Sequence, residues 1–203
     1  MKRPLLGLIY TLESLRQSGI DVDTPLLQAG IPVSSLRGDA WVSRDQELQL
    51  LQVLCRSMAA QPPSGVSPGL MAASAFSLAC YGPLSMLLVS CATSWEALQE
   101  GIRFQGLTLL FGALSLEPGV PHSCLRLRPA AVPDDVHDFV MDRDLAAIVK
   151  LVKDLQSNLG FWRKPVRMLL PKRRASVASA HAAFFDCPVE VAGEDCVIVF
   201  AKT

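Results

Sequence analysis

The side chains that could support catalysis are few and scattered along the sequence. The chain holds only three histidines, and its paired carboxylates are Asp134-Asp135 and Asp142/Asp144. A pair of carboxylates can act as general acid and base, and a histidine can exchange a proton near neutral pH. The positions of these carboxylates instead favour helix capping and compensation of helix dipoles in the first turn. We predict no catalytic residue and expect that the chain is not an enzyme.

One short cluster has the residue types of a metal site. Asp135, His137 and Asp138 carry oxygen and nitrogen atoms that ligate metals. At these spacings the three side chains do not stack on one face of a helix. The patterns G-x-S-x-G, H-E-x-x-H, G-x-G-x-x-G and the phosphate-binding loop are also missing from the sequence. We predict neither a metal site nor a cofactor.

The aromatic and basic side chains favour a different chemistry, the binding of a small apolar molecule. Aromatic residues, Phe161 and Trp162 among them, are spread around the junction between the two halves of the chain. They either fill the core or line an apolar pocket, and an arginine beside such a pocket would anchor an anionic group. The candidate ligand-binding residues are Phe76, Tyr81, Arg103, Phe104, Phe111, Phe139 and Arg143.

A stripe of apolar residues follows the expected helix near residues 134–158. Its members alternate spacings of four and three, which is the pattern of a heptad seam. The stripe is compatible with packing on the domain's own sheet and with a homodimer interface. The candidate interface residues are Met141, Leu145, Ile148, Val152 and Leu155.

The longest uncharged segment runs for 39 residues, from Ser57 to Trp95, in a chain that is 50% hydrophobic with a mean hydropathy of +0.32. A membrane-spanning helix needs about 20 consecutive, mainly apolar residues. Prolines such as Pro62 and Pro83 divide this segment into shorter pieces, because proline lacks the backbone donor of a helix interior. We therefore predict two short buried helices, at 68–80 and 83–91, and no contact with a membrane.

Charge and cysteine content restrict the class of protein further. The 19 basic residues equal the 19 acidic ones, whereas a nucleic-acid-binding domain normally has a basic excess on one face. The six cysteines include no C-x-x-C pair, which indicates a reducing, cytoplasmic setting. The 203 residues suffice for one domain with its own core.

The elements that must position these residues change in character near Gly106. Up to residue 106 the sequence predicts helices, and Ser43/Gln46 and Thr93/Glu96 have the spacing of capping boxes. From 107 to 203 the order of expected elements is β-β-α-β-α-β-β. The sequence thus predicts an α+β fold, with a helical subdomain (1–106) packed on an α+β subdomain (107–203) whose small, mainly antiparallel sheet carries helices on one face.

Several short motifs, in this order, resemble one protein family. The chain is similar to the N-terminal sensor domain of AraC-type transcriptional regulators, often labelled the arabinose-binding-like domain. The family's usual glycine-rich texture before residue 81 is replaced here by Leu78-Ala79-Cys80. The resemblance rests on Gly19-Ile20-Asp21, Leu27-Gln28-Ala29-Gly30-Ile31, Gly69-Leu70, Tyr81-Gly82-Pro83-Leu84, Leu88-Val89-Ser90, Thr93-Ser94-Trp95-Glu96-Ala97-Leu98, Phe184-Phe185-Asp186-Cys187-Pro188-Val189, Gly193 and Val197-Ile198-Val199-Phe200.

The resemblance implies an effector-binding and dimerisation domain of a bacterial transcription activator or repressor. It implies a small-molecule effector, for which the apolar sequence favours a fatty acid or an aromatic acid, and a homodimer as the working form. DNA would be bound only by a helix-turn-helix domain that these 203 residues do not include, so we expect the sequence to be part of a longer regulator. The alternatives are a stand-alone protein–protein interaction module and a small enzyme with an apolar pocket.

Overall fold

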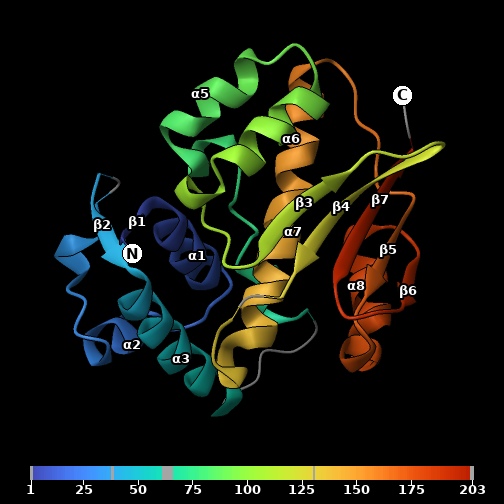
Figure 1. The fold of residues 1–203 in the computed structure, drawn as a ribbon. Coiled ribbons are helices and arrows are strands. Elements are labelled where there is room, and N and C mark those ends of the chain that lie inside the picture. Colours follow the sequence, from blue (N-terminus) through green and yellow to red (C-terminus); the bar gives the residue numbers. More distant parts are fainter. Residues whose placement is uncertain (1, 38, 61–65, 130, 202–203) are drawn as a thin grey trace.

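The computed structural model describes residues 2–37, 39–60, 66–129 and 131–201, so Pro62 lies outside it. The predicted α+β fold is confirmed. Helices from the first half of the chain lie beside a five-stranded sheet that is built entirely from the second half (Figure 1). Among the described residues, no helix combines the length and the apolar character needed to cross a membrane.

The N-terminal helices enclose a core of their own. Leu8, Leu12 and Leu15 recur on one side of the first helix and are buried against the second and third helices. Two three-residue strands pair antiparallel beside them and are too short to show the alternation that predicts strands. The elements are β1 (Lys2–Pro4), α1 (Leu6–Gln17), α2 (Asp23–Gln28), the 3₁₀ turn η1 (Val33–Ser35), β2 (Trp41–Ser43) and α3 (Arg44–Ala60).

The middle segment departs from prediction in one place. The helix expected at 68–80 is only one turn of α-helix, followed later by a 3₁₀ turn. After that first turn the Ala75 N–H donates to Ser14 Oγ at 2.9 Å and the Phe76 N–H donates to the Ala73 carbonyl at 3.1 Å, so α-helical hydrogen bonding does not continue. The helix expected at 83–91 is confirmed. The elements are α4 (Pro68–Met71), η2 (Leu78–Tyr81), α5 (Pro83–Ser90), α6 (Ser94–Arg103) and η3 (Gln105–Leu107).

The two predicted capping boxes differ in outcome. At α3 the box is confirmed, since the Gln46 N–H donates to Ser43 Oγ at 3.1 Å and the Ser43 N–H to Gln46 Oε1 at 3.2 Å. At α6 only half of it forms. The Glu96 N–H donates to Thr93 Oγ1 at 3.1 Å, but the Glu96 carboxylate accepts from the Ala92 N–H at 2.9 Å rather than from Thr93.

The sheet has the strand order β3-β4-β7-β5-β6, in which only the β5–β6 pair is parallel. The predicted order of elements is confirmed. The second helix of this predicted order begins at Ala178, directly after a 3₁₀ turn. The elements are β3 (Ala113–Glu117), β4 (His122–Arg128), α7 (Asp134–Asn158), β5 (Arg167–Leu170), η4 (Lys172–Val177), α8 (Ala178–Phe185), β6 (Val189–Val191) and β7 (Cys196–Ala201).

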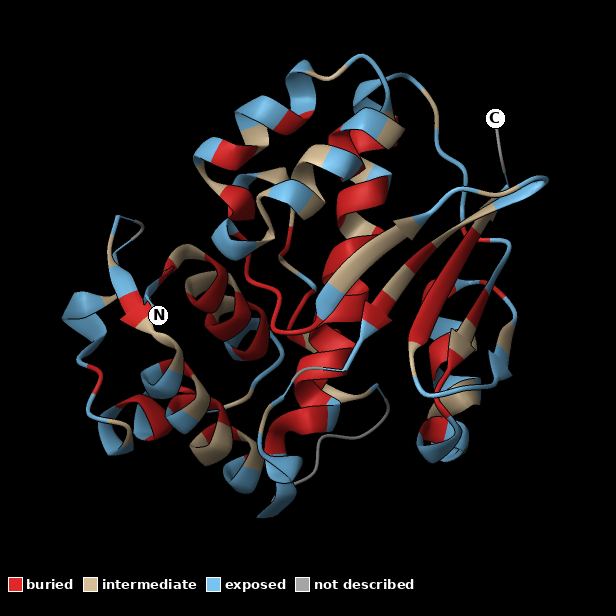
Figure 2. Ribbon diagram, viewed as in Figure 1, coloured by how far each residue is buried: buried red, intermediate tan, exposed pale blue. Residues whose placement is uncertain are grey.

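Helix α7 runs through the centre of the molecule and is buried along most of its length (Figure 2). The prediction that Asp134 or Asp135 caps it is wrong. Pro133 occupies the cap position, and both aspartates lie in the first turn, where their charge favours the positive end of the helix dipole. Asp135 also accepts a hydrogen bond from Arg56 at 3.0 Å, which ties α7 to α3.

Two groups of buried side chains make up the core, and α7 contributes to both. The first joins α1–α3 to the start of α7, and the second joins α4–α6 to the rest of α7, the sheet and α8. Each group therefore contains residues from both sides of position 106. The boundary between a helical and an α+β subdomain at 106/107 stays a prediction.

Candidate functional site

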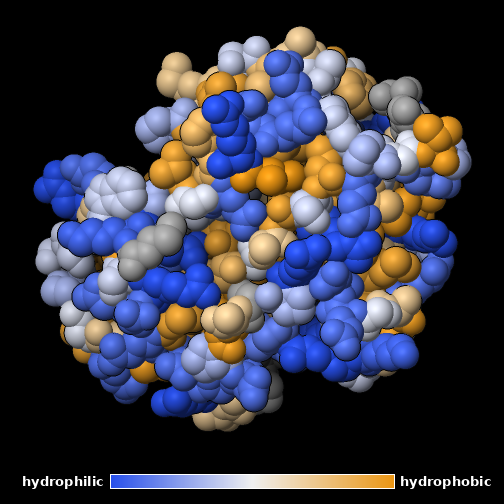
Figure 3. All heavy atoms as spheres, in the orientation of Figure 1, coloured by the Kyte–Doolittle hydropathy of each residue, from blue (hydrophilic) through white to orange (hydrophobic). Residues whose placement is uncertain are grey.

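A cavity of about 340 Å³ opens between α6, the β3–β4 hairpin, the end of α7 and β7. This volume lies at the lower end of the range of small-molecule sites, about 300–1,000 Å³. Apolar surface is visible between α6 and β3 in Figure 3. The cavity is lined by Ser94, Trp95, Leu98, Leu116, Pro118, Ser123, Cys124, Leu125, Val152, Gln156, Phe161, Arg163, Phe200 and Ala201.

Regular elements hold this lining in place. Thr93 caps the start of α6, which fixes Trp95 and Leu98 over the cavity. Ser123 lies two residues before the buried Leu125, so both project from the same face of β4. Along α7, Val152 and Gln156 are four residues apart and share one side of the helix.

The lining is apolar apart from one cation and a few neutral polar groups. Arg163 is its only charged residue, and none of the lining residues is acidic. Gln156 is buried, and its Oε1 accepts a hydrogen bond from the Arg163 N–H at 2.8 Å. This bond attaches the chain after α7 to the last turn of the helix.

The cavity lining supplies apolar surface and a few hydrogen-bonding groups. The described lining contains no histidine and no carboxylate that could act as a general base. Its cysteine, Cys124, is free, and burial raises the pKa of this thiol, which disfavours the nucleophilic thiolate. Elsewhere in the described chain, no three potential ligands come together in a way that could hold a metal ion.

The structure brings none of the seven candidate ligand-binding residues into this lining. Phe76 and Tyr81 are buried in the core around α7, and Phe104 packs against its edge. The side chain of Arg103 is 71% exposed and forms an ion pair with Glu100 at 3.6 Å.

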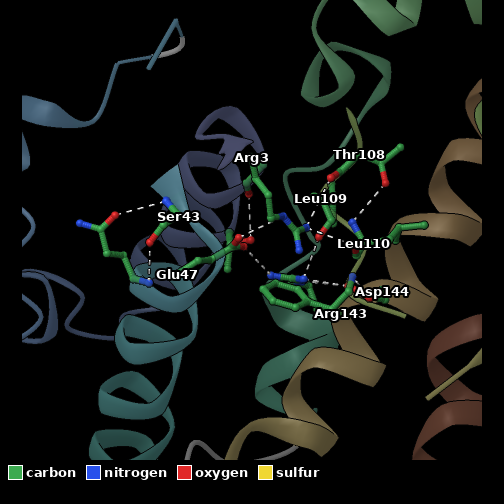
Figure 4. Close-up of polar contacts among 12 residues, drawn as sticks. Arg3, Ser43, Glu47, Thr108, Leu109, Leu110, Arg143 and Asp144 are labelled. Carbon is green, nitrogen blue, oxygen red and sulfur yellow. Dashed lines mark hydrogen bonds and ion pairs between the residues drawn. The ribbon is translucent and has the colours of Figure 1, made fainter. Parts of the chain in front are cut away.

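The other three candidates lie where α7 packs against the N-terminal helices. Phe139 packs among the N-terminal helices, and Arg143 is fully buried in a charge cluster with Arg3, Glu47 and Asp144 (Figure 4). Arg143 donates to Asp144 Oδ1 at 2.8 Å and to the Leu109 carbonyl at 3.1 Å. The ring of Phe111 stacks with the guanidinium of Arg3 at 4.0 Å.

Asp144, which was expected to cap a helix, belongs to this buried charge cluster. Asp144 lies in the middle of α7 and is fully buried. Its Oδ2 accepts from the Phe111 and Gly112 N–H groups at 2.7 and 3.0 Å, which ties the segment before β3 to the helix. The expectation of capping is therefore wrong for this residue, because tertiary partners in the core satisfy its charge.

Asp142, the other carboxylate of that pair, also lies in mid-helix, in a second buried network. Its Oδ1 accepts from Arg174 at 2.5 Å and lies 2.8 Å from His181 Nε2. Asp135 and Asp138, whose carboxylates could ligate a metal, have different partners. Asp135 pairs with Arg56, whereas Asp138 pairs with Arg174, so each carboxylate already has a cationic partner.

The five candidate dimer-interface residues are all buried within this chain. Met141, Leu145, Ile148, Val152 and Leu155 are at most 4% exposed and belong to the core that α7 forms with the sheet. The structure favours the first alternative, in which the stripe packs on the chain's own sheet. In this conformation the stripe presents no surface to a second chain.

Sequence reasoning missed most of the cavity. Phe161 is one of the aromatic residues noted at the junction of the two halves, but Arg163 is not among the candidate ligand-binding residues. The available signal was the position of Gln156, a long polar side chain that follows Val152 by one helical turn on an otherwise apolar face. That signal alone does not tell a cavity from the protein surface.

The comparisons with known proteins agree with the fold. A family model described as the arabinose-binding domain of AraC transcription regulators, N-terminal, matches residues 19–203. The crystal structure of the transcriptional regulator CdpR from Pseudomonas aeruginosa is similar, with a TM-score of 0.59 and 17% sequence identity, over 89% of this chain and 53% of that chain. No curated protein matches the sequence.

The likeness to CdpR, at this identity, is one of fold, and this chain spans only 53% of the CdpR chain. The family match is broader, because it covers all but the first 18 residues. The chain therefore belongs to the family of arabinose-binding N-terminal domains of AraC transcription regulators.

Proposed function

We propose that this chain is the effector-binding and dimerisation part of an AraC-type transcriptional regulator. The cavity between α6, the β3–β4 hairpin, α7 and β7 is its effector site. The observation that carries this proposal is the conjunction of the family match with one cavity of ligand size, walled by regular elements of the sheet half. DNA is bound by a helix-turn-helix domain outside these 203 residues.

The effector is a small, mainly apolar or amphipathic molecule, with fatty acids and aromatic acids as the first classes to test. Support comes from the lining, in which Leu98, Leu116 and Phe161 supply apolar surface and Arg163 supplies the only charge. A sugar would need many more polar partners, since each of its hydroxyl groups loses water on burial. Although the family is called arabinose-binding, this name does not imply that arabinose is the ligand of this chain.

Homodimerisation is part of the proposal, because regulators that read paired half-sites on DNA generally act as symmetric dimers. The apolar stripe on α7 is not the proposed surface, since it is buried in the core. Light scattering on the purified 203-residue chain checks this point directly. A monomer at all accessible concentrations would contradict dimerisation by this domain alone.

A thermal-shift screen tests the effector site. A ligand at 100 times its dissociation constant stabilises the native state by about 2.7 kcal/mol. For a chain of this size, each kcal/mol raises Tm by about 2–4 °C, so we expect shifts of about 5–11 °C. The screen compares fatty acids, aromatic acids, amino acids and sugars. Stabilisation by amino acids or sugars alone would contradict an apolar effector.

Two variants of one residue locate the site. Ser123→Phe adds a ring to the cavity wall, whereas Ser123→Ala removes only a hydroxyl group. We expect the phenylalanine variant to lose the ligand-induced shift and the alanine variant to keep it. If a hit stabilises Ser123→Phe as strongly as the unsubstituted chain, the effector binds elsewhere.

A further inference from the structure

Two polar residues of the cavity lining, Gln156 and Arg163, lie where α7 ends. Gln156 is 8% exposed and lines the cavity, and its carboxamide is oriented by the Arg163 N–H at 2.8 Å. A backbone N–H can only donate, so the side-chain atom that faces it is the oxygen. The Nε2 donor of Gln156 is therefore the remaining polar atom of this side chain. It donates to no other residue in the described part of the chain.

Arg163 differs from the basic residues that follow it. Lys164 forms an ion pair with Asp186 at 2.8 Å, and Arg167 forms one with Glu190 at 3.2 Å. The guanidinium of Arg163 pairs with no carboxylate among residues 2–37, 39–60, 66–129 and 131–201. Arg163 is an exposed residue of the cavity lining, and the described lining contains no acidic residue.

We propose that Arg163 and Gln156 form the head-group end of the cavity and that they select a monocarboxylic acid. The guanidinium donates to the carboxylate in a forked geometry, and Gln156 Nε2 donates a further hydrogen bond to it. The apolar body of the acid lies against Leu98, Leu116 and Phe161. This inference rests on the proposed role of the cavity as the effector site.

The charge pattern distinguishes an acid from its neutral and cationic relatives. An amide or alcohol of the same shape fills the apolar wall equally well, but it forms only neutral hydrogen bonds at Arg163. An amine places a second cation beside the guanidinium, with no acidic residue in the described lining to balance it. The order of affinity is therefore acid, then amide, then amine.

Isothermal titration calorimetry on the 203-residue chain tests this order with two matched pairs of probes. The pairs are octanoate with octanamide and 3-phenylpropanoate with 3-phenylpropanamide. Hydrogen bonds to a charged group contribute enough for a discrimination of roughly tenfold to hundredfold between an acid and its amide. We expect at least one pair to show it.

Three variants assign the discrimination to residues. Arg163→Gln should weaken acid binding roughly tenfold to hundredfold and leave amide binding nearly unchanged. Gln156→Glu keeps the oxygen that accepts from the Arg163 N–H but replaces the free donor by a negative oxygen. It should therefore weaken the acid selectively. Lys164→Gln, a neighbouring exposed cation outside the lining, is the control and should change neither affinity.

The outcomes separate this inference from the proposed function. Equal binding of acids and amides, unaffected by Arg163→Gln but abolished by Ser123→Phe, would overturn the head-group assignment and keep the cavity as the effector site. Acid binding that survives Ser123→Phe would contradict both the head-group assignment and the cavity as the effector site. Failure of all four probes to bind the folded chain, as judged by its urea denaturation curve, would also overturn the selection of simple monocarboxylic acids.

Discussion

Truncation of Arg143 separates a structural role from a ligand-binding role for the most deeply buried arginine of the chain. Arg143→Ala removes two hydrogen bonds to Asp144 Oδ1, one to the Leu109 carbonyl, and an ion pair with Glu47 at 3.7 Å. Both carboxylates are at most 3% exposed, so water cannot replace the lost partner. The substitution leaves the buried carboxylate of Asp144 without its counter-ion, whereas Glu47 keeps its ion pair with Arg3.

The magnitude follows from this loss. Removal of one partner from a buried ion pair costs about 3–5 kcal/mol, which is a large part of the ~5–15 kcal/mol that holds a domain folded. At about 2–4 °C per kcal/mol, Tm should fall by about 6–20 °C. Asp144 keeps its bonds from the Phe111 and Gly112 N–H groups, which places the expected effect in the lower half of this range.

Urea denaturation followed by circular dichroism measures the change, and Arg103→Ala is the matched control. The side chain of Arg103 is 71% exposed, and its ion pair with Glu100 spans 3.6 Å, so its removal should change stability by no more than about 1 kcal/mol. If Arg143→Ala proves as stable as Arg103→Ala and instead abolishes ligand binding, the structural role assigned to the cluster is refuted. Arg143 would then be a ligand anchor.

Further substitutions concern Glu47 of the same charge cluster, Gly69 in α4 and Thr93 at the start of α6. Burial raises the pKa of the Glu47 carboxyl, so the native state binds this proton more tightly than the unfolded chain, and stability falls as the pH rises between the two pKa values. Glu47→Gln cannot titrate, and urea denaturation at several pH values should show a smaller decline in this window. Gly69→Ala would place a Cβ against the carbonyl of Phe139, and we expect a loss of about 1–3 kcal/mol by the same method. Thr93→Ala removes the cap that accepts from the Glu96 N–H and should cost about 1 kcal/mol, whereas Thr93→Ser should be nearly neutral.

The order of elements was predictable because local signals agree with the fold. Ser43 and Gln46 mark the start of α3, and the alternation in Leu125-Arg126-Leu127-Arg128 marks a strand with one buried face. The short strands β1 and β2 escaped prediction, since their pairing is decided by contacts between residues about 40 positions apart. The local pattern also predicted too long a helix at 68–80, because the Ala75 N–H bonds to Ser14 of α1, a partner that the local sequence does not reveal.

The candidate site was harder to predict than the fold, because burial of a charge depends on tertiary partners. Arg103, Arg143 and Arg163 look alike in the sequence, yet one is exposed, one is buried among carboxylates and one lies at the wall of a cavity. The residues beside each arginine do not show whether its side chain is buried or exposed, although Arg143 alone is flanked by two aspartates. Their environments are set by which elements the sheet and α7 bring beside them.

The same argument explains what the apolar stripe on α7 means. A spacing of four and three shows that one side of a helix is buried, but it does not show what buries it. In the middle of α7, at Leu145 and Ile148, the sheet and the other helices cover the stripe completely. At Val152 this side of the helix reaches the cavity, which Gln156 lines one helical turn later. The proposed effector site is thus a continuation of the hydrophobic core, so a bound apolar molecule should stabilise the whole domain and not only the loops at the cavity mouth.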